Sequence, residues 1–445
     1  MNGTPGSIGR LNMRFSGSTK DLPHVVIVGG GFGGLQAAKG LARAPVRVTL
    51  VDKHTYHMFR PLMYEVATGL LTADEVAPPL RVILRRQRNV DVRRGEVTGI
   101  DAPNQIVQVE PCDLPYDYLI LATGIRSNYF GNDTWKQFAP SLDSLDDADT
   151  IRGNILSAFE KAERLAACSA DPELIQAMMT FILVGGGTVG VELAGTIAEL
   201  CRLALNDEFR HIDPAIAKIF LYEGAPRILP TFPEDLSKKA SQHLESLGVQ
   251  VRTGVKIERV DGTGVVAGGV HVPSGTVLWA AGVIASPAAT WLGAEAGRGG
   301  RVKVNADLSV PGLPNVFVIG DTADVVANKR NLLGIKSGRG EMPGLAQPAM
   351  QEGRFVSKLI AARVEGKQIQ STFSYIDMGD LAIVGRAYAV ADLRFWRSAG
   401  FIAWLLWASV HISSLIGYAN RFFVLTHWAI AFLTNRRHER TYRGS

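Results

Sequence analysis

A glycine-rich turn follows the first apolar run of the chain, His24–Val28, and has the spacing of a phosphate-binding loop. Gly29, Gly31 and Gly34 form a GxGxxG pattern, and the next apolar run ends in Asp52, 18 residues after the last glycine. In such a unit the glycines allow a tight turn, a close approach to a pyrophosphate and close helix–strand packing. Free N–H groups at the helix start bind phosphate, and the acid binds a ribose. The segment predicts a dinucleotide-binding module.

A second copy of the pattern begins 156 residues further along the chain. Gly185, Gly187 and Gly190 follow another apolar run, and the next run ends in Glu223. This acid comes 33 residues after the last glycine instead of about 20. A long helix and a loop around residues 211–214 could account for the excess. Two modules in one chain imply two bound dinucleotides.

Further apolar runs end in small or acidic residues, where the backbone can pass close to a ligand. Residues 116–121 lead into Ala122-Thr123-Gly124, and residues 313–319 lead into Gly320-Asp321. Ligands of open α/β sheets bind at the carboxyl ends of the strands, so Asp321 could accept a hydrogen bond from a ribityl hydroxyl.

The positive charge of the chain is concentrated in its C-terminal tail. The whole chain has 47 Lys and Arg against 42 Asp and Glu, a net charge of +5. Residues 391–445 contain seven arginines and two acids, which accounts for all of it, and four of the seven tryptophans. Arginine and tryptophan beside apolar runs indicate an anionic bilayer surface as partner, in preference to nucleic acid.

Two apolar runs make up most of this tail. Ala399–Ala419 is just long enough to cross a bilayer, but polar residues gather in its second half, and Phe422–Leu433 follows after Arg421. We therefore expect two half-length helices that lie in the membrane interface. A soluble pair of dimerisation helices would explain the apolarity but not the arginines and tryptophans. Polytopic transporters and ion pumps are excluded.

Cysteine and histidine usage argues against disulfides and metals. Cys112, Cys168 and Cys201 form no CxxC pair, so we expect a reducing compartment and three buried thiols. The nine histidines lack metal-ligand spacing, so no metal site is expected. Residues 1–21 are expected to form a flexible tail without a secretory signal.

The order of these motifs resembles that of flavoproteins with two dinucleotide-binding domains. Within that family the chain is similar to type II NADH dehydrogenases, which are single-chain NADH:quinone oxidoreductases. The similarity spans roughly residues 22–440 and is carried by His57–Gly69, Val184–Gly195, Ala346–Gln351 and Phe373–Arg386.

The resemblance implies an α/β fold of two Rossmann-like dinucleotide-binding domains, the second inserted in the first, plus a C-terminal membrane-association region. The FAD-binding domain would comprise residues 22–145 and 305–372, the NADH-binding domain 146–304, and the membrane-anchoring region with amphipathic helices 373–445. FAD would be held non-covalently, NADH would be the electron donor and a membrane quinone the two-electron acceptor, without ion pumping. The resemblance further implies a homodimer, peripheral and monotopic, on the cytoplasmic face of the cell membrane.

The same resemblance assigns site residues. For FAD they are Gly29, Gly31, Phe32, Gly33, Gly34, Asp52, Lys53, Arg60, Val97, Ala122, Thr123, Gly124, Gly320, Asp321, Ala346 and Gln347. For NADH they are Gly185, Gly186, Gly187, Thr188, Val189, Gly190, Glu192, Glu223, Ala281 and Gly282. For the quinone they are Gln347, Met350 and Gln351, and the catalytic residues are Glu192, Gln347 and Gln351.

Several of these assignments have simpler alternatives. Glu223 should bind the ribose of NADH and repel the 2′-phosphate of NADPH, or it is a solvated acid at a strand end. Glu192 could relay protons to reduced quinone, or only complement the positive end of a helix. Gln347 and Gln351 share one helix face, where they could bind quinone or flavin, or only cap the helix.

Other enzymes of this fold are disfavoured by their sequence requirements. Sulfide:quinone oxidoreductases need reactive cysteines near the flavin, and no cysteine follows Cys201. Soluble ferredoxin and disulfide reductases would not have this tail, and the latter need a CxxxxC pair. Another flavin-dependent NADH reductase or an NADH-binding redox sensor is the alternative function. Two features depart from the family pattern: Met378 stands where many relatives have lysine, and the polar insertion Val325–Glu341 has no assigned role.

Overall fold

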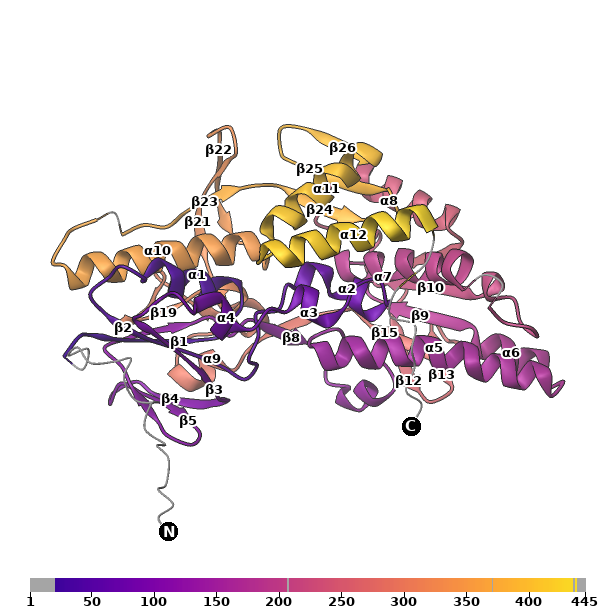
Figure 1. The fold of residues 1–445 in the computed structure, drawn as a ribbon, viewed down its shortest axis with the longest axis horizontal. Helices are drawn as coiled ribbons and strands as arrows, with labels where there is room; N and C mark the ends of the chain where they lie inside the picture. The colour runs from indigo at the N-terminus through magenta and orange to yellow at the C-terminus, as the bar shows by residue number, and fades with distance from the viewer. Residues whose placement is uncertain (1–20, 206–207, 370, 435–436, 438–445) are drawn as a thin grey trace, which may run out of the picture.

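The computed structural model describes residues 21–205, 208–369, 371–434 and 437. Figure 1 shows two α/β modules beside each other, with the C-terminal helices α11 (Phe401–Ser414) and α12 (Tyr418–Thr434) along one edge. The N-terminal tail expected at residues 1–21 lies outside the described residues, except for Asp21.

The first module is built on a six-stranded sheet with the order β18-β19-β7-β1-β2-β3. Its strands are β1 (His24–Val28), β2 (Arg47–Asp52), β3 (Val90–Arg94), β7 (Tyr118–Leu121), β18 (Ser309–Val310) and β19 (Leu313–Val318). All pairings except β18 with β19 are parallel. Strand β1 is buried along its whole length, as a continuous Val and Ile run predicts for a central parallel strand. Helices α1 (Phe32–Gly40) and α10 (Ala346–Val364) pack on each other above this sheet.

The second module repeats this plan on a four-stranded parallel sheet with the order β11-β10-β9-β15. Its strands are β9 (Thr180–Val184), β10 (Lys218–Glu223), β11 (Val249–Thr253) and β15 (Thr276–Trp279). Its helices are α5 (Leu145–Ala167), α6 (Pro172–Met178), α7 (Thr188–Glu199) and α8 (Glu234–Ser246). An antiparallel sheet of β12 (Ile257–Asp261), β13 (Gly264–Ala267) and β14 (Val270–Pro273) belongs to the same module, at the edge of Figure 1 away from the C-terminal helices.

Two short antiparallel strands connect the modules, β8 (Ile125–Ser127) and β16 (Val283–Ala285). After β16 the chain enters the core of the first module, where Ala288 and Val302 are buried among residues of β1 and β7. The chain therefore returns to the first module near Ala288, earlier than the boundary expected between residues 304 and 305.

The C-terminal region packs on the second module. A sheet of β24 (Asp380–Ile383), β25 (Ala389–Asp392) and β26 (Arg397–Gly400) leads into α11 and α12. Trp407 of α11 and Val424 of α12 belong to the same hydrophobic core as Phe181 of β9. The expectation of two half-length helices is confirmed, with a turn at Gly417 (φ 98°) between them. Among the described residues, no helix combines the length and apolarity needed to cross a membrane.

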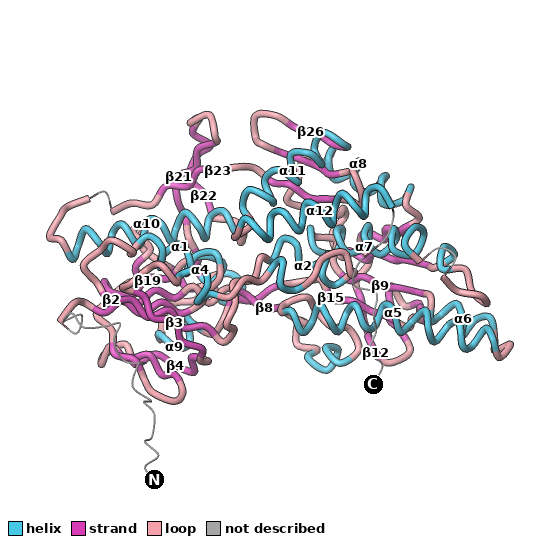
Figure 2. Tube along the Cα trace, in the orientation of Figure 1, coloured by secondary structure: helices cyan, strands magenta, loops and turns pink. Residues whose placement is uncertain are grey.

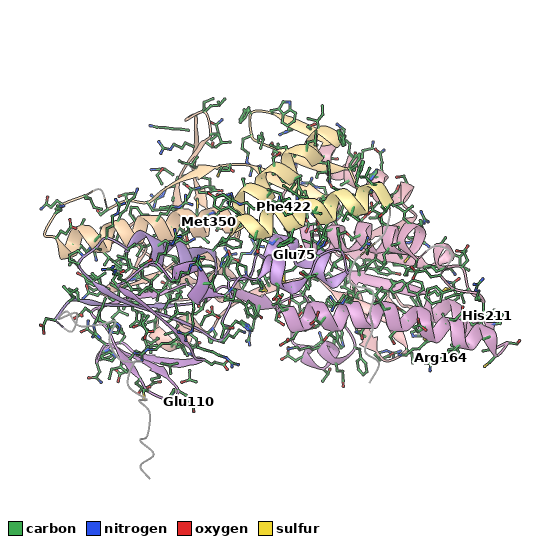
Figure 3. The ribbon with its side chains drawn as sticks, in the orientation of Figure 1. Glu75, Glu110, Arg164, His211, Met350 and Phe422 are labelled. Atoms are coloured by element: carbon green, nitrogen blue, oxygen red, sulfur yellow. The ribbon has the colours of Figure 1, made fainter. Side chains whose placement is uncertain are left out.

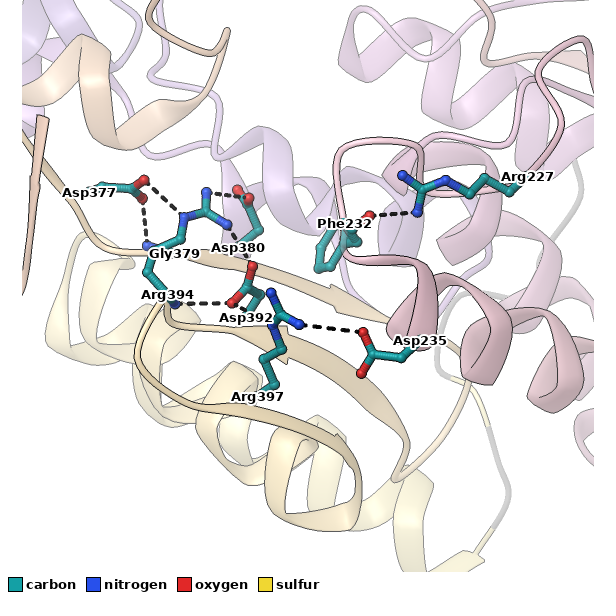
Figure 4. Close-up of polar contacts among 9 residues, drawn as sticks. All are labelled: Arg227, Phe232, Asp235, Asp377, Gly379, Asp380, Asp392, Arg394 and Arg397. Atoms are coloured by element: carbon teal, nitrogen blue, oxygen red, sulfur yellow. Dashed lines mark hydrogen bonds and ion pairs between the residues drawn. The ribbon is translucent and has the colours of Figure 1, made fainter. Parts of the chain in front are cut away.

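Ion pairs fasten the turn between β25 and β26. Arg394 pairs at 2.7–2.9 Å with three aspartates, Asp377, Asp380 and Asp392. Figure 4 shows this cluster beside Arg397, which lies 3.7 Å from Asp235 of α8. The turn is thereby held to its own sheet and to the second module.

The insertion at residues 325–341 forms a hairpin. Strands β21 (Val326–Asn331) and β22 (Lys336–Glu341) pair antiparallel, and β23 (Ser374–Asp377) pairs with β21. Figure 2 shows that the hairpin projects from the body, at the edge where β26 also lies.

The expectation of three buried thiols is wrong for two of them. Cys201 is buried, but Cys112 and Cys168 are exposed and all three are free. Cys112 lies between β5 (Ile106–Val109) and β6 (Leu114–Pro115), and Cys168 is the C-cap of α5. Both positions are surface connections, where the chain turns and no second layer covers it.

Candidate functional site

The two glycine loops have the same geometry at corresponding positions. Gly29 and Gly185 have φ angles of 104° and 113°, which favour glycine. A Cβ on either would lie 2.2–2.6 Å from the carbonyl group of a neighbouring strand end. A Cβ on Gly31 or on Gly187 would have no neighbouring atom within 4 Å, so both glycines face open space. This is the clearance that a pyrophosphate needs beside the backbone.

The third glycine of each loop brings helix and strand into contact. A Cβ on Gly34 would lie 1.8 Å from the carbonyl oxygen of Gly29, and one on Gly190 would lie 1.8 Å from that of Gly185. Phe32 and Gly33 open α1, and Thr188 and Val189 open α7. Each helix start therefore has its N–H groups beside the open space of its loop.

The acid that ends the second strand of each module binds its own loop. Asp52 Oδ2 accepts a hydrogen bond from Gly30 N at 2.5 Å, and Glu223 Oε2 accepts one from Gly186 N at 2.6 Å. Each carboxylate also accepts a bond from the backbone N–H two residues further along. Helix α7 and the following turns and loop take up the longer sequence spacing, so Glu223 reaches the position that Asp52 has in the first module.

Small-residue turns from both modules meet at the junction. Thr123 Oγ1 lies 2.5 Å from Ser286 Oγ and 3.2 Å from Thr322 Oγ1. Gly124 and Gly282 both have a φ of 68° and each immediately precedes a strand of the β8–β16 pair. The predicted turns at residues 122–124 and 281–282 are thus brought together.

Helix α10 brings the segment Ala346–Gln351 to the first glycine loop. A Cβ on Gly353 would lie 2.2 Å from the carbonyl oxygen of Gly33, so α1 and α10 touch through their backbones. At the end of β19, Gly320 N donates to Glu352 Oε2 at 2.6 Å. Burial raises the pKa of Glu352 to about 8. Sequence reasoning missed Glu352, although it directly follows the Ala346–Gln351 segment.

The two predicted glutamines lie on α10 but differ in their partners. The side-chain amide of Gln351 donates to Ile376 O and accepts from Ile376 N, both at 2.9 Å. The amide therefore holds β23 against α10. Gln347 and Met350 are half-buried, and Figure 3 shows Met350 at the end of α10 nearest α12.

The other predicted FAD residues lie at the margins of the loop. Lys53 is exposed directly after β2, and Val97 is buried in β4 (Val97–Asp101). Arg60 Nη2 lies 3.3 Å from Asp143 Oδ1. Burial raises the pKa of Asp321, against the charges of Arg301 and Arg60, which lower it.

His57 is a structural residue of the first loop. Its Nδ1 lies 2.9 Å from Gly30 O, and burial lowers its pKa to about 4. The ring is therefore neutral at neutral pH and supports the loop by hydrogen bonding alone.

Glu192, near the start of α7, is buried, with an exposed fraction of 8%. Burial raises its pKa well above the ordinary value, Glu65 raises it further, and a backbone hydrogen bond from Ile383 opposes the shift. Such a carboxyl keeps a proton to higher pH than an exposed glutamate does. The raised pKa suits a group that holds a proton, whereas a complement to the helix dipole would be ionised.

A pocket lies between the second module and the tail helices. Glu65, Glu199 and Arg437 line it together with three tryptophans. Glu65 accepts hydrogen bonds from Tyr64 Oη at 2.8 Å and Trp428 Nε1 at 2.7 Å, and burial raises its pKa to about 7. Beside it, Glu75 Oε1 of α3 (Ala73–Val76) lies 2.8 Å from His427 Nδ1 of α12. Figure 3 labels Glu75 beside α12. The described residues contain no group of three or more His, Cys, Asp or Glu that could hold a metal ion.

Comparisons with known proteins agree with this arrangement. The model of the pyridine nucleotide-disulphide oxidoreductase family matches residues 23–353, and that of the NDH2 C-terminal domain matches residues 378–437. Type II NADH:quinone oxidoreductase Ndh of Mycobacterium tuberculosis is 43% identical over 433 residues, which cover 94% of this chain and 90% of the relative. The chain belongs to the type II NADH:quinone oxidoreductase family.

More distant members of the type II NADH:quinone oxidoreductase family share the fold. The Staphylococcus aureus protein of that description is 29% identical over 382 residues, 82% of this chain and 88% of the relative. The structure of NDH2 from Plasmodium falciparum in complex with NADH has a TM-score of 0.82 at 20% identity and covers 93% of this chain and 99% of that one. The sulfide:quinone oxidoreductase of Aquifex aeolicus reaches a TM-score of 0.67 at 16% identity, with 92% of each chain covered. The fold is therefore common to both enzymes, and the sequence identity assigns the chain to the type II NADH:quinone oxidoreductases.

Proposed function

We propose that this protein oxidises NADH by means of bound FAD and reduces a membrane quinone by two electrons, without pumping ions. The observation that carries the proposal is the pair of glycine loops with equal clearances, one in each module. Their modules join at the β8–β16 strands, where the turns at Gly124 and Gly282 meet. Dinucleotides on the two loops would direct their reactive rings to this junction.

The first loop fits the diphosphate of FAD. Open space at Gly31 leaves room for the pyrophosphate, and Asp52 at the end of β2 would bind the adenosine ribose. Asp321 would bind the ribityl chain from the end of β19. The flavin, when bound, supplies the two-electron redox chemistry, and the protein supplies position and electrostatics.

The second loop fits NADH in preference to NADPH. Glu223 lies at the ribose end of the loop, with its oxygens held by the N–H groups of Gly186 and Ala225. A fixed carboxylate there can accept a hydrogen bond from a ribose hydroxyl and repels a 2′-phosphate.

Quinone reduction requires protons as well as electrons, and Glu192 is suited to supply one. Burial raises the pKa of its carboxyl, which lies close enough to Glu65 for the two to interact. Glu65, with a pKa of about 7, lines the pocket below the tail helices. A proton lost from Glu192 could be replaced through this second carboxyl.

The quinone would reach the flavin from the side of the tail helices, next to Gln347 and Met350 on α10. Gln347 can donate a hydrogen bond to a quinone carbonyl without adding charge. Gln351, whose amide is bound to Ile376, would position this end of α10 and would not touch the quinone.

An anionic bilayer surface is the proposed partner of the tail helices. Both helices carry large exposed apolar side chains, among them Phe401, Ile402, Leu405, Phe422, Phe423 and Leu425. Several large apolar side chains exposed together on a helix beside arginines are typical of a helix lying in a membrane interface. We place the enzyme on the cytoplasmic face as a homodimer, as the family resemblance implies, and sedimentation in detergent would test the dimer.

Anaerobic absorbance spectra test the function. One equivalent of NADH should bleach an oxidised flavin band of the purified protein, and a short-chain quinone should restore it. Bleaching without restoration would indicate a flavoprotein with another acceptor or a redox sensor. A folded sample without a flavin band would contradict the proposal.

A further inference from the structure

We propose that the β21–β22 hairpin is a second membrane contact, whose apolar tip enters an anionic lipid surface beside the tail helices. The inference goes beyond the proposed function, because neither electron transfer nor the tail helices require this hairpin. It uses the proposed bilayer surface only to define the orientation of the molecule.

Three aliphatic residues occupy the tip of the hairpin. Leu332, Leu333 and Ile335 have exposed fractions of 46%, 63% and 60%. The turn that presents them is well formed: Gly334 N donates to Asn331 O, and Asn331 N donates to Ile335 O, both at 2.9 Å. The side-chain oxygen of Asn331 also accepts bonds from the N–H groups of Leu333 and Ile335. The apolar side chains are thus held outward by an ordered turn, where surface hairpins ordinarily have polar residues.

Cations surround this apolar tip. Lys329, Arg330, Lys336 and Arg339 lie on the two strands, and Glu341 is the only acid of residues 326–341, a net charge of 4 − 1 = +3. Basic residues around a small apolar tip match the headgroup and acyl layers of an anionic membrane. A second copy of this chain would bring the same positive charge to the contact, so self-association at the tip is electrostatically unfavourable.

The hairpin lies at the same edge of the molecule as other exposed apolar residues. Figure 1 shows β22 and β26 projecting together at this edge. The turn before β26 exposes Phe395 and Trp396 by 48% and 40%, and α11 begins directly after β26 with Phe401 and Ile402, which are 52% and 65% exposed. A flat surface could therefore contact the hairpin tip and the start of α11 together.

A fluorescent probe at the tip tests the contact directly. In a Cys112→Ser/Cys168→Ser background, where only buried Cys201 remains, Leu333→Cys would carry an environment-sensitive fluorophore. Val270→Cys, on an exposed strand (63%) of the β12–β14 sheet, is the matched control. Vesicles of phosphatidylcholine with phosphatidylglycerol should shift the tip emission to the blue, vesicles of phosphatidylcholine alone should shift it less, and the control probe should not respond.

The outcomes separate lipid from other partners. No blue shift at position 333 in protein that sediments with the vesicles would overturn the proposal, because the tail would then bind without the tip. A shift that depends on protein concentration and not on vesicles would assign the tip to a second copy and also overturn it.

Removal of the apolar tip gives an independent measurement. Leu332→Ser/Leu333→Ser/Ile335→Ser should weaken binding to the anionic vesicles about tenfold or more, because each aliphatic side chain loses its burial in lipid. Ile216→Ser/Val270→Ser, which changes exposed aliphatics of the second module, should leave binding unchanged. The rate of flavin reduction by NADH should be equal in the parent protein, the tip variant and the control variant. If the proposed function is wrong, the parent protein itself will show no flavin reduction, whereas a wrong proposal for the tip affects only vesicle binding. Equal vesicle binding by the tip variant and the parent would contradict the proposal.

Discussion

A helix packs on α1, which follows the first glycine loop, and the tail sheet packs on α7, which follows the second. A Cβ on Gly353 of α10 would lie 2.2 Å from the Gly33 carbonyl oxygen, and a Cβ on Gly195 of α7 would lie 2.7 Å from Gly385 N, between β24 and β25. In both modules a later segment of the chain thus touches the helix that follows the loop. Although the loops have equal backbone clearances, they differ in the segment that packs on the following helix.

The side chains differ more than the backbones. Two residues after the last glycine, the first helix has Gln36, which is half-buried and accepts a hydrogen bond from Arg354 at 3.2 Å. The second helix has Glu192 at the corresponding position, buried and with its pKa raised. In the proposed function the backbone of each module would bind the nucleotide, and residues on the following helix would supply the chemistry.

Alanine in place of the third glycine of each loop should have the largest effect, and the effect should differ between the two loops. Each new Cβ would lie 1.8 Å from a carbonyl oxygen, an overpacking that costs about 1–3 kcal/mol or more. We expect Gly34→Ala to lose flavin on purification. Gly190→Ala should keep flavin but be reduced by NADH at least about 100-fold more slowly, equivalent to about 2.7 kcal/mol.

The flavin-to-protein absorbance ratio and stopped-flow reduction measure these effects. Gly262→Ala is the control, since its Cβ would have an ordinary contact of 3.5 Å with Phe138. Loss of the same ligand from both variants would contradict the assignment of one dinucleotide to each loop.

A change of charge at the second acid should alter cofactor choice. Glu223→Arg should lower kcat/KM for NADH and raise it for NADPH, a change of about 100-fold in their ratio, because the repulsion of a 2′-phosphate becomes attraction. Asp52→Asn should alter flavin content and leave this ratio unchanged. Steady-state kinetics with both nucleotides measure the ratio, and an unaltered preference would remove Glu223 from the nucleotide site.

Glu192→Gln makes the second helix resemble the first at this position. We expect quinone-dependent turnover to fall about 10–100-fold, and by more than the rate of flavin reduction by NADH, because the lost group is a proton donor. The wild-type quinone rate should decrease as pH rises above the elevated pKa of Glu192, and the variant should lose this dependence. Parallel pH–rate profiles would show that Glu192 has only a structural role.

The buried carboxyls of Glu65 and Glu352 should make the stability of the fold depend on pH, and this is the smallest of the four predicted effects. Burial raises the pKa of Glu65 from 4.5 to about 7 and that of Glu352 from 4.5 to about 8. In these intervals the folded protein holds more protons than the unfolded chain. The contribution of these two carboxyls to stability is therefore fully present below pH 4.5 and is lost as pH rises through about 7 for Glu65 and about 8 for Glu352.

Removal of either carboxyl should reduce this loss of stability. Glu65→Gln and Glu352→Gln should each lessen the decline of Tm between pH 5 and pH 8 by a few degrees, corresponding to roughly 1–3 kcal/mol. Exposed Glu96→Gln is the control. If the decline of Tm with pH is the same in Glu65→Gln, in Glu352→Gln and in the wild type, these carboxyls ionise freely in the folded state.

Local patterns were sufficient to predict the glycine loops, their acids and the division of the tail into two helices. These features follow from backbone requirements within a few tens of residues, and even the unusual spacing of Glu223 is absorbed by α7 and the segment after it. The burial of side chains was not predictable in the same way. Trp428 meets Glu65 across 363 positions of sequence, and a single sequence contains no signal for that contact.

The role of Gln351 illustrates the same limit. Its spacing from Gln347 correctly predicts a shared helix, but the partner of its amide is the backbone of Ile376, which pairing of β23 with β21 brings into reach. The exposure of Cys112 and Cys168 likewise depends on which segments the fold leaves uncovered.

The shared core of the tail and the second module has a consequence for making a water-soluble form of this enzyme. Because Trp407 and Val424 are buried in the same core as Phe181, truncation of the tail would expose the interior of the second module. Solubilisation should therefore proceed by surface redesign. Polar substitutions at outward positions such as Phe422 and Leu433, which are 66% and 81% exposed, would make the tail surface more polar and leave the core intact.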